Sequence, residues 1–512
     1  MVAGFGAAFF LFSGLNPCNF AAMPAPVISV AQMREWESAT WMTGRTEASV
    51  IARAGEIVAE RIKKMMRVGD LVLILAGKGH NGDDARAART NLPDWRVYLR
   101  NVTDPETDLA EVMTILEQRP ALIVDGLFGI GLNRPLDEKW AALIHRVNEL
   151  NTQVLAIDVP SGLNADTGEP QGAAIRASVT LTMGAPKLGL LLPEASQYVG
   201  RLEVAPEIGL IRCPHPSETY WTLPSDFEDF PPSRAAAAHK GDFGHVAILA
   251  GSMGYHGAAV LAARGAQRAQ PGLITLFTPE VVYHSVVPHL QAVMVSLWQA
   301  NLKLPGKFSS ILIGPGLAAE DLPDVLKMNT RHAWRDAPVP VVIDASALDW
   351  LPLAPFAKNA VRVITPHPGE AARLLRTSPQ QIQANRPHAL REISRRFGNC
   401  WVVLKGSQTL IGRSTGEIVV NSTGNAQLAQ GGSGDVLAGF LAGLLAQPAL
   451  QSDPLRTLCY GVWQHGAAAD QLSQSRQNWV VEDLAVAIGN CRVREAKYHA
   501  AKSAEIADSS RI

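Results

Sequence analysis

The sequence lacks several patterns that would assign a chemistry at once. No Gly-x-x-x-x-Gly-Lys-Ser/Thr motif occurs in its 512 residues, which excludes the usual phosphate-binding P-loop. The five cysteines are scattered without a Cys-x-x-Cys pair, which excludes zinc sites and a disulfide framework and indicates a reducing compartment. Neither charge sign is in excess, since 46 Lys and Arg stand against 47 Asp and Glu, so neither nucleic acid nor membrane is expected as a partner. We therefore expect small-molecule chemistry in the cytoplasm.

Long apolar runs are also scarce. Residues 5–15, FGAAFFLFSGL, are the one segment that resembles an anchor or a targeting signal. This segment is shorter than the about 20 apolar residues that cross a bilayer, and it lacks the Lys or Arg start of secretory signals. More ordinary sequence begins at Met23. Our hypothesis is that translation starts there, and that residues 1–24 are an N-terminal extension or a mis-assigned start.

The rest of the chain alternates short aliphatic runs with helix-like stretches, in two series. The first series includes LVLILAG, ALIVDGLFG and QVLAIDVPSG, and the second includes HVAILAG, SILIGPG and VRVITPHPGE. Between them, residues 212–242 are rich in Pro and polar residues. This pattern predicts two α/β domains with buried parallel sheets, whose ligands bind outside the carboxyl ends of the strands. The predicted boundaries are 25–212 and 239–496 for the domains, 213–238 for a linker and 497–512 for a tail.

The stretch GGSGD, residues 431–435, precedes an apolar helix-like segment. Its glycines let successive N–H groups turn toward one point, and the start of a helix adds positive potential there, so an anion can bind. Beside such a site, Asp435 can take the proton from a hydroxyl that attacks phosphorus. The alternative is a tight loop followed by an ordinary helix-start acid. For this motif alone, the two interpretations are about equally supported.

Three other strand ends in this half carry polar or glycine residues. KGSQT (residues 405–409) follows a strand and suits nucleotide contacts, TPHPGE (365–370) presents His367, and IGPG (313–316) adds a glycine turn. Each motif alone is weak evidence for a binding site, because a His between prolines is usually a loop residue and a Lys-Gly pair is usually a turn. Together they predict a cleft.

The ordered series HKGDFGHVAILAGS, GPG, IDASAL, TPHPGEAARLL, VVLKGSQTLI and GGSGDVLAG resembles the ribokinase-like ADP-dependent NAD(P)H-hydrate dehydratases over residues 239–490. In that family a nucleotide phosphorylates the C6 hydroxyl of the hydrated nicotinamide ring, and loss of phosphate restores NAD(P)H. The resemblance implies that Asp435 acts as base and contacts the hydrate. It also implies a nucleotide site made by Lys405, Gly406, Ser407, Gln408, Thr409 and Gly434, and a hydrate site lined by Ala258, Gly316 and His367.

This half departs from the family at three loops that we expect near the cleft. Ser346 stands where an acid is usual, Gln427 stands where Gly is common, and Gln270-Pro271 replaces an Ala-Gly pair. We expect these changes to affect substrate affinity more than reaction type.

The N-terminal series contains Gly77, Gly79 and Gly82 as a Gly-x-Gly-x-x-Gly pattern after a predicted strand. A dinucleotide-binding turn shows this pattern, but the acid expected about 20 residues later is not evident. Asp125 and Asp158 follow two other strands. Carboxylates at neighbouring strand ends repel unless a cation, a ligand or protonation offsets the charge. The structural alternative is that these carboxylates cap the helices that follow them. For Asp125 this alternative is about as well supported as a functional role, and for Asp158 it is less well supported.

Residues 30–210 resemble the NAD(P)H-hydrate epimerases, and the fusion of both halves resembles the bacterial bifunctional NAD(P)H-hydrate repair enzymes. The resemblance implies that Asp158 is the acid–base group that interconverts the R and S hydrates. It implies a potassium ion bound by Asn81, Asp125 and Ser161. The hydrate contacts it implies are His80, Asn81, Gly82, Asp83, Asp84, Gly129, Ile130, Gly131, Leu132, Asn133, Arg134, Pro135 and Asp158.

The first loop of this half differs from the family pattern. Where the family has Gly-Asn-Asn-Gly-Gly-Asp-Gly, this chain has His80 in place of an Asn, and Asp83 and Ala85 in place of glycines. If those glycines have positive φ, each replacement costs on the order of 1 kcal/mol. We therefore expect epimerase activity that is weakened but not lost.

The sequence as a whole predicts a two-domain α/β enzyme, with an N-terminal Rossmann-like three-layer αβα domain and a C-terminal ribokinase-like αβα domain. It is expected to epimerise (R)- and (S)-NAD(P)HX and to dehydrate the S form with ADP and Mg²⁺, releasing AMP and phosphate. Its partners are expected to be NADHX, NADPHX and ADP, without nucleic acid or membrane, in a homo-oligomer. The alternatives are a ribokinase-like small-molecule kinase with a non-catalytic dinucleotide-binding N-terminal domain, a dinucleotide-dependent oxidoreductase and a dinucleotide sensor.

Overall fold

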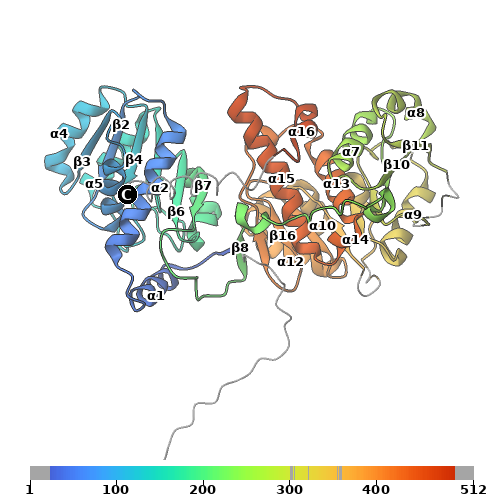
Figure 1. Ribbon diagram of the computed structural model, residues 1–512, viewed down its shortest axis with the longest axis horizontal. Coiled ribbons are helices and arrows are strands. Elements are labelled where there is room, and N and C mark those ends of the chain that lie inside the picture. Colours follow the sequence, from blue (N-terminus) through green and yellow to red (C-terminus); the bar gives the residue numbers. More distant parts are fainter. Residues whose placement is uncertain are drawn as a thin grey trace, which may run out of the picture.

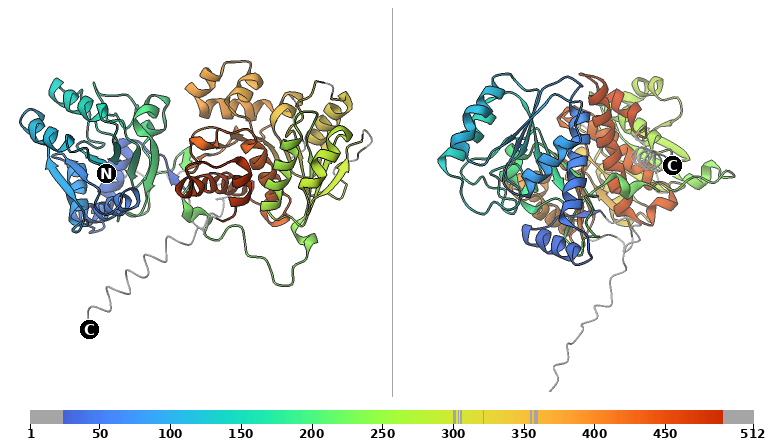
Figure 2. Two further views of the ribbon diagram at one scale, coloured as in Figure 1. Left: turned by 90° about the horizontal axis from the view of Figure 1, so that it is seen from above. Right: turned by 60° about the vertical axis from the view of Figure 1, so that its left-hand side comes forward.

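The chain forms two separate β-sheets, each covered by helices (Figure 1). This computed structural model describes residues 24–299, 302, 304, 306–320, 322–353, 356 and 360–490. The expectations on residues 1–23 and on the tail therefore concern residues outside the described ranges. Viewed from above, the two sheets lie in separate lobes (Figure 2).

The N-terminal sheet has six strands in the order β3-β2-β4-β5-β6-β7, and all its neighbouring strands are parallel. Its strands are β2 (Val72–Ala76), β3 (Val97–Asn101), β4 (Leu122–Gly126), β5 (Gln153–Ile157), β6 (Val179–Met183) and β7 (Arg201–Ala205). The helices of this half are α1 (Val30–Trp41), α2 (Glu47–Met65), α3 (His80–Thr90), α4 (Pro105–Leu116), α5 (Glu138–Glu149) and α6 (Ser196–Val199).

The C-terminal sheet has eleven strands in the order β1-β8-β17-β16-β15-β14-β13-β12-β9-β10-β11. These are β1 (Ala25–Pro26), β8 (Thr219–Trp221), β9 (His245–Leu249), β10 (Leu273–Thr278), β11 (Met294–Leu297), β12 (Ser310–Ile313), β13 (Val341–Ile343), β14 (Arg362–Ile364), β15 (Trp401–Leu404), β16 (Leu410–Gly412) and β17 (Ile418–Val420). The helices are α7 (His256–Arg268), α8 (Glu280–Val286), α9 (Asp324–Asp336), α10 (Pro368–Leu375), α11 (Pro379–Ala384), α12 (Arg386–Arg396), α13 (Ser433–Leu445), α14 (Pro448–Gln451), α15 (Pro454–Ser475) and α16 (Val481–Ala487).

The central strands of both sheets are buried on both faces, which explains why their sequences are continuous apolar runs. In β2, Val72 and Ile74 pack against α2 and α3, whereas Leu73 and Leu75 pack against α4 and α5. In the other sheet, the core under Ile248 contains α7, α13, α15 and α16, and the opposite core contains α9, α10 and α12. Each half therefore has three layers, and the predicted α/β class is confirmed.

Strands β10 to β15 and β9 all run parallel, so their carboxyl ends lie along one edge of the C-terminal sheet. The same holds for β2, β4, β5 and β6 in the N-terminal sheet. These two edges are where the predicted site residues lie. Within the described residues, no helix has the length and hydropathy to span a membrane.

The segment expected as a linker contributes a strand to the C-terminal sheet. Strand β8 lies within residues 213–238 and runs parallel to β17, with Trp221 almost fully buried. Strand β1, from the start of the predicted first domain, pairs with β8 on its other side. Strands of two and three residues are too short for an alternating pattern to be recognised in a Pro-rich segment. The two halves are thus joined by strand pairing as well as by covalent linkage.

Candidate active sites

The first candidate site lies at the start of α13, where GGSGD is located. Gly432 precedes the helix with φ of 95°, and a Cβ at this position would lie 2.4 Å from the Leu261 side chain. Only glycine meets both conditions. No side chain caps α13. Ser433 N donates to Gln430 O at 3.3 Å, and the next N–H groups, those of Gly434 and Asp435, remain available to an anion.

Asp435 lies in the first turn of α13 and faces a charged group of side chains. Burial raises the pKa of Asp435 to about 7, with the charges of Asp344 and Glu370 adding to the effect and Lys405 opposing it. A Cβ at Gly434 would lie 3.3 Å from Nζ of Lys405. The structure therefore brings the predicted residues Lys405, Gly434 and Asp435 together.

Asp344 and Glu370 complete this group, and the sequence reasoning did not single them out. Lys405 Nζ lies 2.9 Å from Asp344 Oδ1 and 3.8 Å from Glu370 Oε2. Burial opposes the charge on Lys405, but Asp344 and Glu370 outweigh it and raise the pKa of Lys405. A detectable signal for Asp344 was its position directly after β13, where a strand-end acid is expected.

His367 lies at the N-cap of α10, at the carboxyl end of β14. Its Nδ1 accepts a hydrogen bond from Gly369 N at 3.0 Å, and its own N–H donates to Glu370 Oε2 at 2.7 Å. This reciprocal cap fixes both side chains. The imidazole is about half exposed, so it can also face a ligand.

The loop of residues 405–409 is held in an unusual conformation by a residue that sequence reasoning missed. Gly406 and Gln408 have φ of 139° and 54°. Arg386, at the start of α12, donates to the carbonyls of Ser407 and Gln408 and to Leu404 O at 3.1 Å. Burial lowers the pKa of Arg386 to about 10, so it remains charged at neutral pH. Arg386 therefore fixes the carbonyls of this loop, whose Ser407 and Thr409 hydroxyls carry the predicted nucleotide contacts.

Ala258, in the first turn of α7, contacts Gly316, which follows β12. Gly316 has φ of 66°, and a Cβ at this position would lie 2.8 Å from the Ala258 Cβ. One of the three expected departures lies elsewhere: Gln270-Pro271 precedes β10 and so lies at the amino end of that strand, away from the site. Our expectation that it lies near the cleft was wrong, because this loop leads from α7 into β10, whereas the site residues follow the carboxyl ends of the strands.

The second candidate site is a cavity of ≈ 1080 Å³ at the carboxyl edge of the N-terminal sheet. The predicted residues that line it are His80, Asn81, Asp84, Gly129, Ile130, Gly131, Leu132, Asn133, Arg134, Pro135 and Asp158. Gly82 and Asp83 are not among its lining residues. A Cβ at Gly82 would lie 2.0 Å from Gly77 O, and Asp83 pairs with Arg86 at 2.8 Å.

The altered first loop is not strained, which corrects our expectation. His80 to Ala85 form the start of α3, and neither Asp83 nor Ala85 has a positive φ. A helical position accepts Asp or Ala without the cost of a left-handed conformation. The strain that was our reason to expect a weakened epimerase is therefore absent. His80 itself pairs with Glu47 at 2.6 Å at the rim of the cavity.

Asp158 faces this cavity and is held by a buried lysine that sequence reasoning missed. Asp158 has φ of 63°, and its Oδ1 accepts hydrogen bonds from Met183 N at 3.0 Å and Thr182 Oγ1 at 3.1 Å. The fully buried Lys187 forms an ion pair with the same oxygen and donates to Met183 O at 2.8 Å. These bonds fix the orientation of the Asp158 carboxylate.

Two further carboxyl groups line the same cavity. Burial, followed by the charge of Asp158, raises the pKa of Asp84 to about 8. Burial and then Asp158 also raise the pKa of Glu37 on α1. With a pKa of about 8, Asp84 is mostly protonated at neutral pH, and it lies in the same cavity as the ion pair of Asp158 and Lys187.

Oxygen atoms gather beside this cavity at the ends of β4 and β5. Asp125 is fully buried and accepts Ser161 N at 2.8 Å and Ser161 Oγ at 2.5 Å. The Phe128 carbonyl accepts Asn81 Nδ2 at 2.9 Å and Ser161 Oγ at 3.2 Å. Burial raises the pKa of Asp125 to about 6. The structure therefore brings together all three residues predicted to bind potassium, and adds the Phe128 carbonyl.

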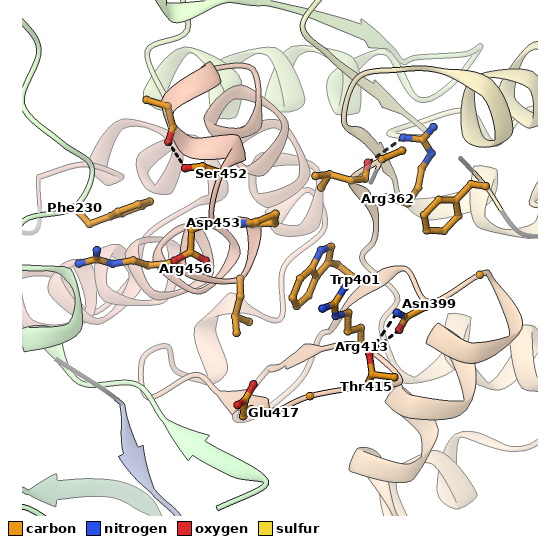
Figure 3. Close-up of a pocket in the computed structure, with 18 of the residues that line it drawn as sticks. Phe230, Arg362, Asn399, Trp401, Arg413, Thr415, Glu417, Ser452, Asp453 and Arg456 are labelled. Carbon is orange, nitrogen blue, oxygen red and sulfur yellow. Dashed lines mark hydrogen bonds between the residues drawn. The ribbon is translucent and has the colours of Figure 1, made fainter. Parts of the chain in front are cut away.

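A further cavity of ≈ 1020 Å³ lies at the amino ends of β14 and β15, away from either site (Figure 3). Its Arg413 guanidinium lies 4.8 Å from the centre of the Trp401 ring. Acidic residues also line it, including Glu417 and Asp453, and offset the charge of Arg413 and Arg456. The lining therefore indicates no particular ligand charge.

Comparison with known proteins gives matches across both halves. A family model described as NAD(P)H-hydrate dehydratase matches residues 246–489, and one described as YjeF-related protein N-terminus matches residues 90–189. A bifunctional NAD(P)H-hydrate repair enzyme of Gloeobacter violaceus is 34% identical over 93% of this chain and 98% of its own length. The protein of the same name from Escherichia coli is 30% identical over 89% of this chain and 91% of its own.

Among solved structures, an ADP/ATP-dependent NAD(P)H-hydrate dehydratase from Bacillus subtilis, co-crystallised with ATP and Mg²⁺, is 31% identical. It covers 51% of this chain and 92% of its own, with a TM-score of 0.46.

Proposed function

Because the chain belongs to the family of bifunctional NAD(P)H-hydrate repair enzymes, we propose that its two sites carry out the two repair reactions of that family. The N-terminal half interconverts (R)- and (S)-NAD(P)HX, and the C-terminal half dehydrates (S)-NAD(P)HX to NAD(P)H. The observation that carries this proposal is that one chain holds two separate strand-end sites, each with an Asp beside a lysine: the fully buried Lys187 in the first site and the partly buried Lys405 in the second. Exchange at the first site makes both forms of the damaged nucleotide available to the second.

In the dehydration step, Asp435 removes the proton from the C6 hydroxyl as its oxygen attacks the β-phosphorus of ADP, and AMP leaves. The C6–O bond then breaks, phosphate departs, and loss of a ring proton restores NAD(P)H. The start of α13 and Lys405 offset the negative charge of the transferring group. We expect Mg²⁺ to enter with the nucleotide, bound mainly by its phosphates. Residues 405–409 and Gly434 bind the nucleotide, and Ala258, Gly316 and His367 line the hydrate site.

In the epimerisation step, Asp84 and Asp158 act at C6 of the same ring. Asp84 donates a proton to the departing hydroxyl, and Asp158 accepts the proton of the water that adds to the other face. The hydroxyl lost and the water gained balance, so the substrate is only inverted. Lys187 keeps Asp158 in position for this transfer. A small-molecule kinase with a non-catalytic N-terminal half, the alternative from the sequence, leaves the buried Lys187–Asp158 pair unexplained.

The deciding experiment is to incubate the enzyme with ADP and a mixture of (R)- and (S)-NADHX, and to follow the absorbance of NADH. Complete recovery is expected, because exchange supplies the S form as dehydration consumes it. No recovery with ADP or with ATP would rule out the proposed function.

The domain boundaries, the homo-oligomer and the cytoplasmic location stay predictions. Limited proteolysis tests the boundaries, light scattering tests the oligomeric state, and cell fractionation tests the location.

A potassium ion bound by Asn81, Asp125, Ser161 and the Phe128 carbonyl belongs to this proposal. The donors are the oxygens that a hard cation prefers, and among the described residues no Lys or Arg forms an ion pair with the buried Asp125. When bound, the ion would offset that charge and provide a positive centre beside the cavity.

We expect potassium in place of sodium to raise the melting temperature and the rate of epimer exchange, and Asp125→Asn to remove both effects. The reason is that the buried carboxylate is then neutral and no longer attracts a cation. Thermal unfolding in matched KCl and NaCl measures the first effect, and exchange kinetics measure the second. Dehydration in the same variant is the control and should remain. Equal melting temperatures of the wild type in both salts would contradict the site.

The dehydration rate should depend on the ionisation of Asp435. Burial and Asp344 raise the pKa of this carboxyl group to about 7, and it acts as a base only when ionised. We therefore expect kcat/KM to fall about tenfold per unit of pH below about pH 7 and to level off above it. Initial rates of NADH formation from (S)-NADHX at constant ionic strength test this. A profile that is flat from about pH 8 to 6 would contradict the role of Asp435 as base.

A further inference from the structure

One buried carboxylate connects the two halves of the chain. Asp470 of α15 is 8% exposed. It accepts hydrogen bonds from Gly424 N at 3.0 Å and Asn425 Nδ2 at 2.9 Å, and forms an ion pair with Arg201 at 2.8 Å. Gly424 and Asn425 belong to the loop that leads into the nucleotide site. Arg201 belongs to β7 of the N-terminal sheet, on the side that faces α15 (Figure 1).

The loop of residues 421–433 lies along α15 and is held at several points. Thr423 Oγ1 donates to Trp463 O at 2.8 Å, and Ser433 O lies 3.0 Å from His465 Nε2. Gln427 donates to Gln477 O at 3.1 Å. Because Ser433 is the first residue of α13, the path of this loop sets where the helix starts and where Asp435 lies. Asp470 holds Gly424 and Asn425, near the start of this loop, through two of its hydrogen bonds.

Arg201 supplies the positive charge in this arrangement. Burial of a charged carboxylate costs free energy unless an opposite charge pairs with it. Asp470 forms such a pair with Arg201. The Arg201 side chain is 40% exposed, so solvent screens part of the attraction. Burial opposes the charge on Arg201, but Asp470 and Glu203 outweigh it and raise the pKa of Arg201.

We propose that Arg201 is a positioning residue for dehydration: the epimerase half supplies the counter-charge that keeps Asp470, and with it the loop of residues 421–433, in place for ADP. This inference rests on the dehydratase assignment of the C-terminal half. It gives the fusion a physical consequence, because the dehydratase site is then completed by a residue of the other half.

The test uses the full-length chain with Arg201→Met, which retains most of the apolar stem. We expect the KM for ADP to rise about fivefold with kcat within about twofold, which is the signature of lost ground-state binding. Epimer exchange should be unchanged. Arg201→Lys restores the charge and should recover part of the affinity for ADP.

Arg61→Met is the matched control. Arg61 pairs with Glu203 through two nitrogens, in the same charged group as Arg201 but without contact to Asp470. Its dehydration kinetics should equal those of the wild type. In the Asp470→Asn background, Arg201→Met should have no further effect on the KM for ADP, because both changes remove the same interaction.

An unchanged KM for ADP in Arg201→Met would overturn the proposal, as would an equal rise in Arg61→Met. A parallel loss of both activities would also overturn it, because it would indicate damage to the fold. Failure of the wild type to dehydrate (S)-NADHX in the same assay would instead reject the proposed function. The two failures are therefore distinguishable.

Discussion

Replacing Asp435 by Asn is expected to lower the rate of NADHX dehydration by about 10²–10⁴-fold, the usual contribution of a general base. The amide has the same shape, so the start of α13 and its N–H groups should be preserved. It cannot take the proton from the C6 hydroxyl, and phosphoryl transfer is therefore slowed. Formation of NADH from (S)-NADHX at saturating ADP gives the rate, and chromatography of the R and S forms shows whether exchange continues.

Two controls separate this effect from general damage. Asp483→Asn changes another acid in the first turn of a C-terminal helix, but one that caps α16 and pairs with Arg476 outside the site. It should retain dehydration. Binding of ADP by Asp435→Asn, measured by calorimetry, should also persist, because the proposed nucleotide contacts lie on residues 405–409 and Gly434. Dehydration above a tenth of the wild-type rate would contradict the role of Asp435.

The sequence was informative wherever a site residue lies in a local pattern. GGSGD before an apolar segment predicted both the start of α13 and the position of Asp435, and the strand ends predicted Asp125 and Asp158. What it did not predict were partners from distant segments. Lys405 was expected from its own loop, but its ion pair with Asp344 spans 61 residues and follows from the order of strands in the sheet.

Burial was the other property that local patterns did not reveal. Lys187 lies in MGAPKLG, a segment that contributed to the family resemblance, yet nothing local distinguishes it from an exposed lysine. Its burial arises because the residues after β6 fold back over the end of β5, where Asp158 lies. The strain expected for Asp83 and Ala85 was wrong for a related reason. The pattern was interpreted as a loop. The structure instead begins α3 at His80, so Asp83 and Ala85 have helical backbone conformations.

Replacing Asp158 by Asn is expected to stop epimer exchange and to leave dehydration intact. Asn cannot accept the proton of the incoming water, and the ammonium group of Lys187 loses the carboxylate with which it is paired. A loss of about 10²–10⁴-fold in exchange is therefore expected. The clearest measurement is the extent of repair rather than its rate. With an R and S mixture and excess ADP, the variant should convert the S form rapidly and then stop at the share of S initially present.

Addition of a second protein distinguishes lost exchange from lost dehydration. Asp435→Asn, which retains an intact epimerase half, should restart NADH formation when it is added to stalled Asp158→Asn, because the R form is then converted to S. Asp166→Asn, which changes an exposed acid that accepts a hydrogen bond from Val30 N, should repair the whole mixture unaided. Complete repair by Asp158→Asn alone at the wild-type rate would remove Asp158 from the reaction. Failure of the mixed variants to complement each other would show that the two sites do not act independently.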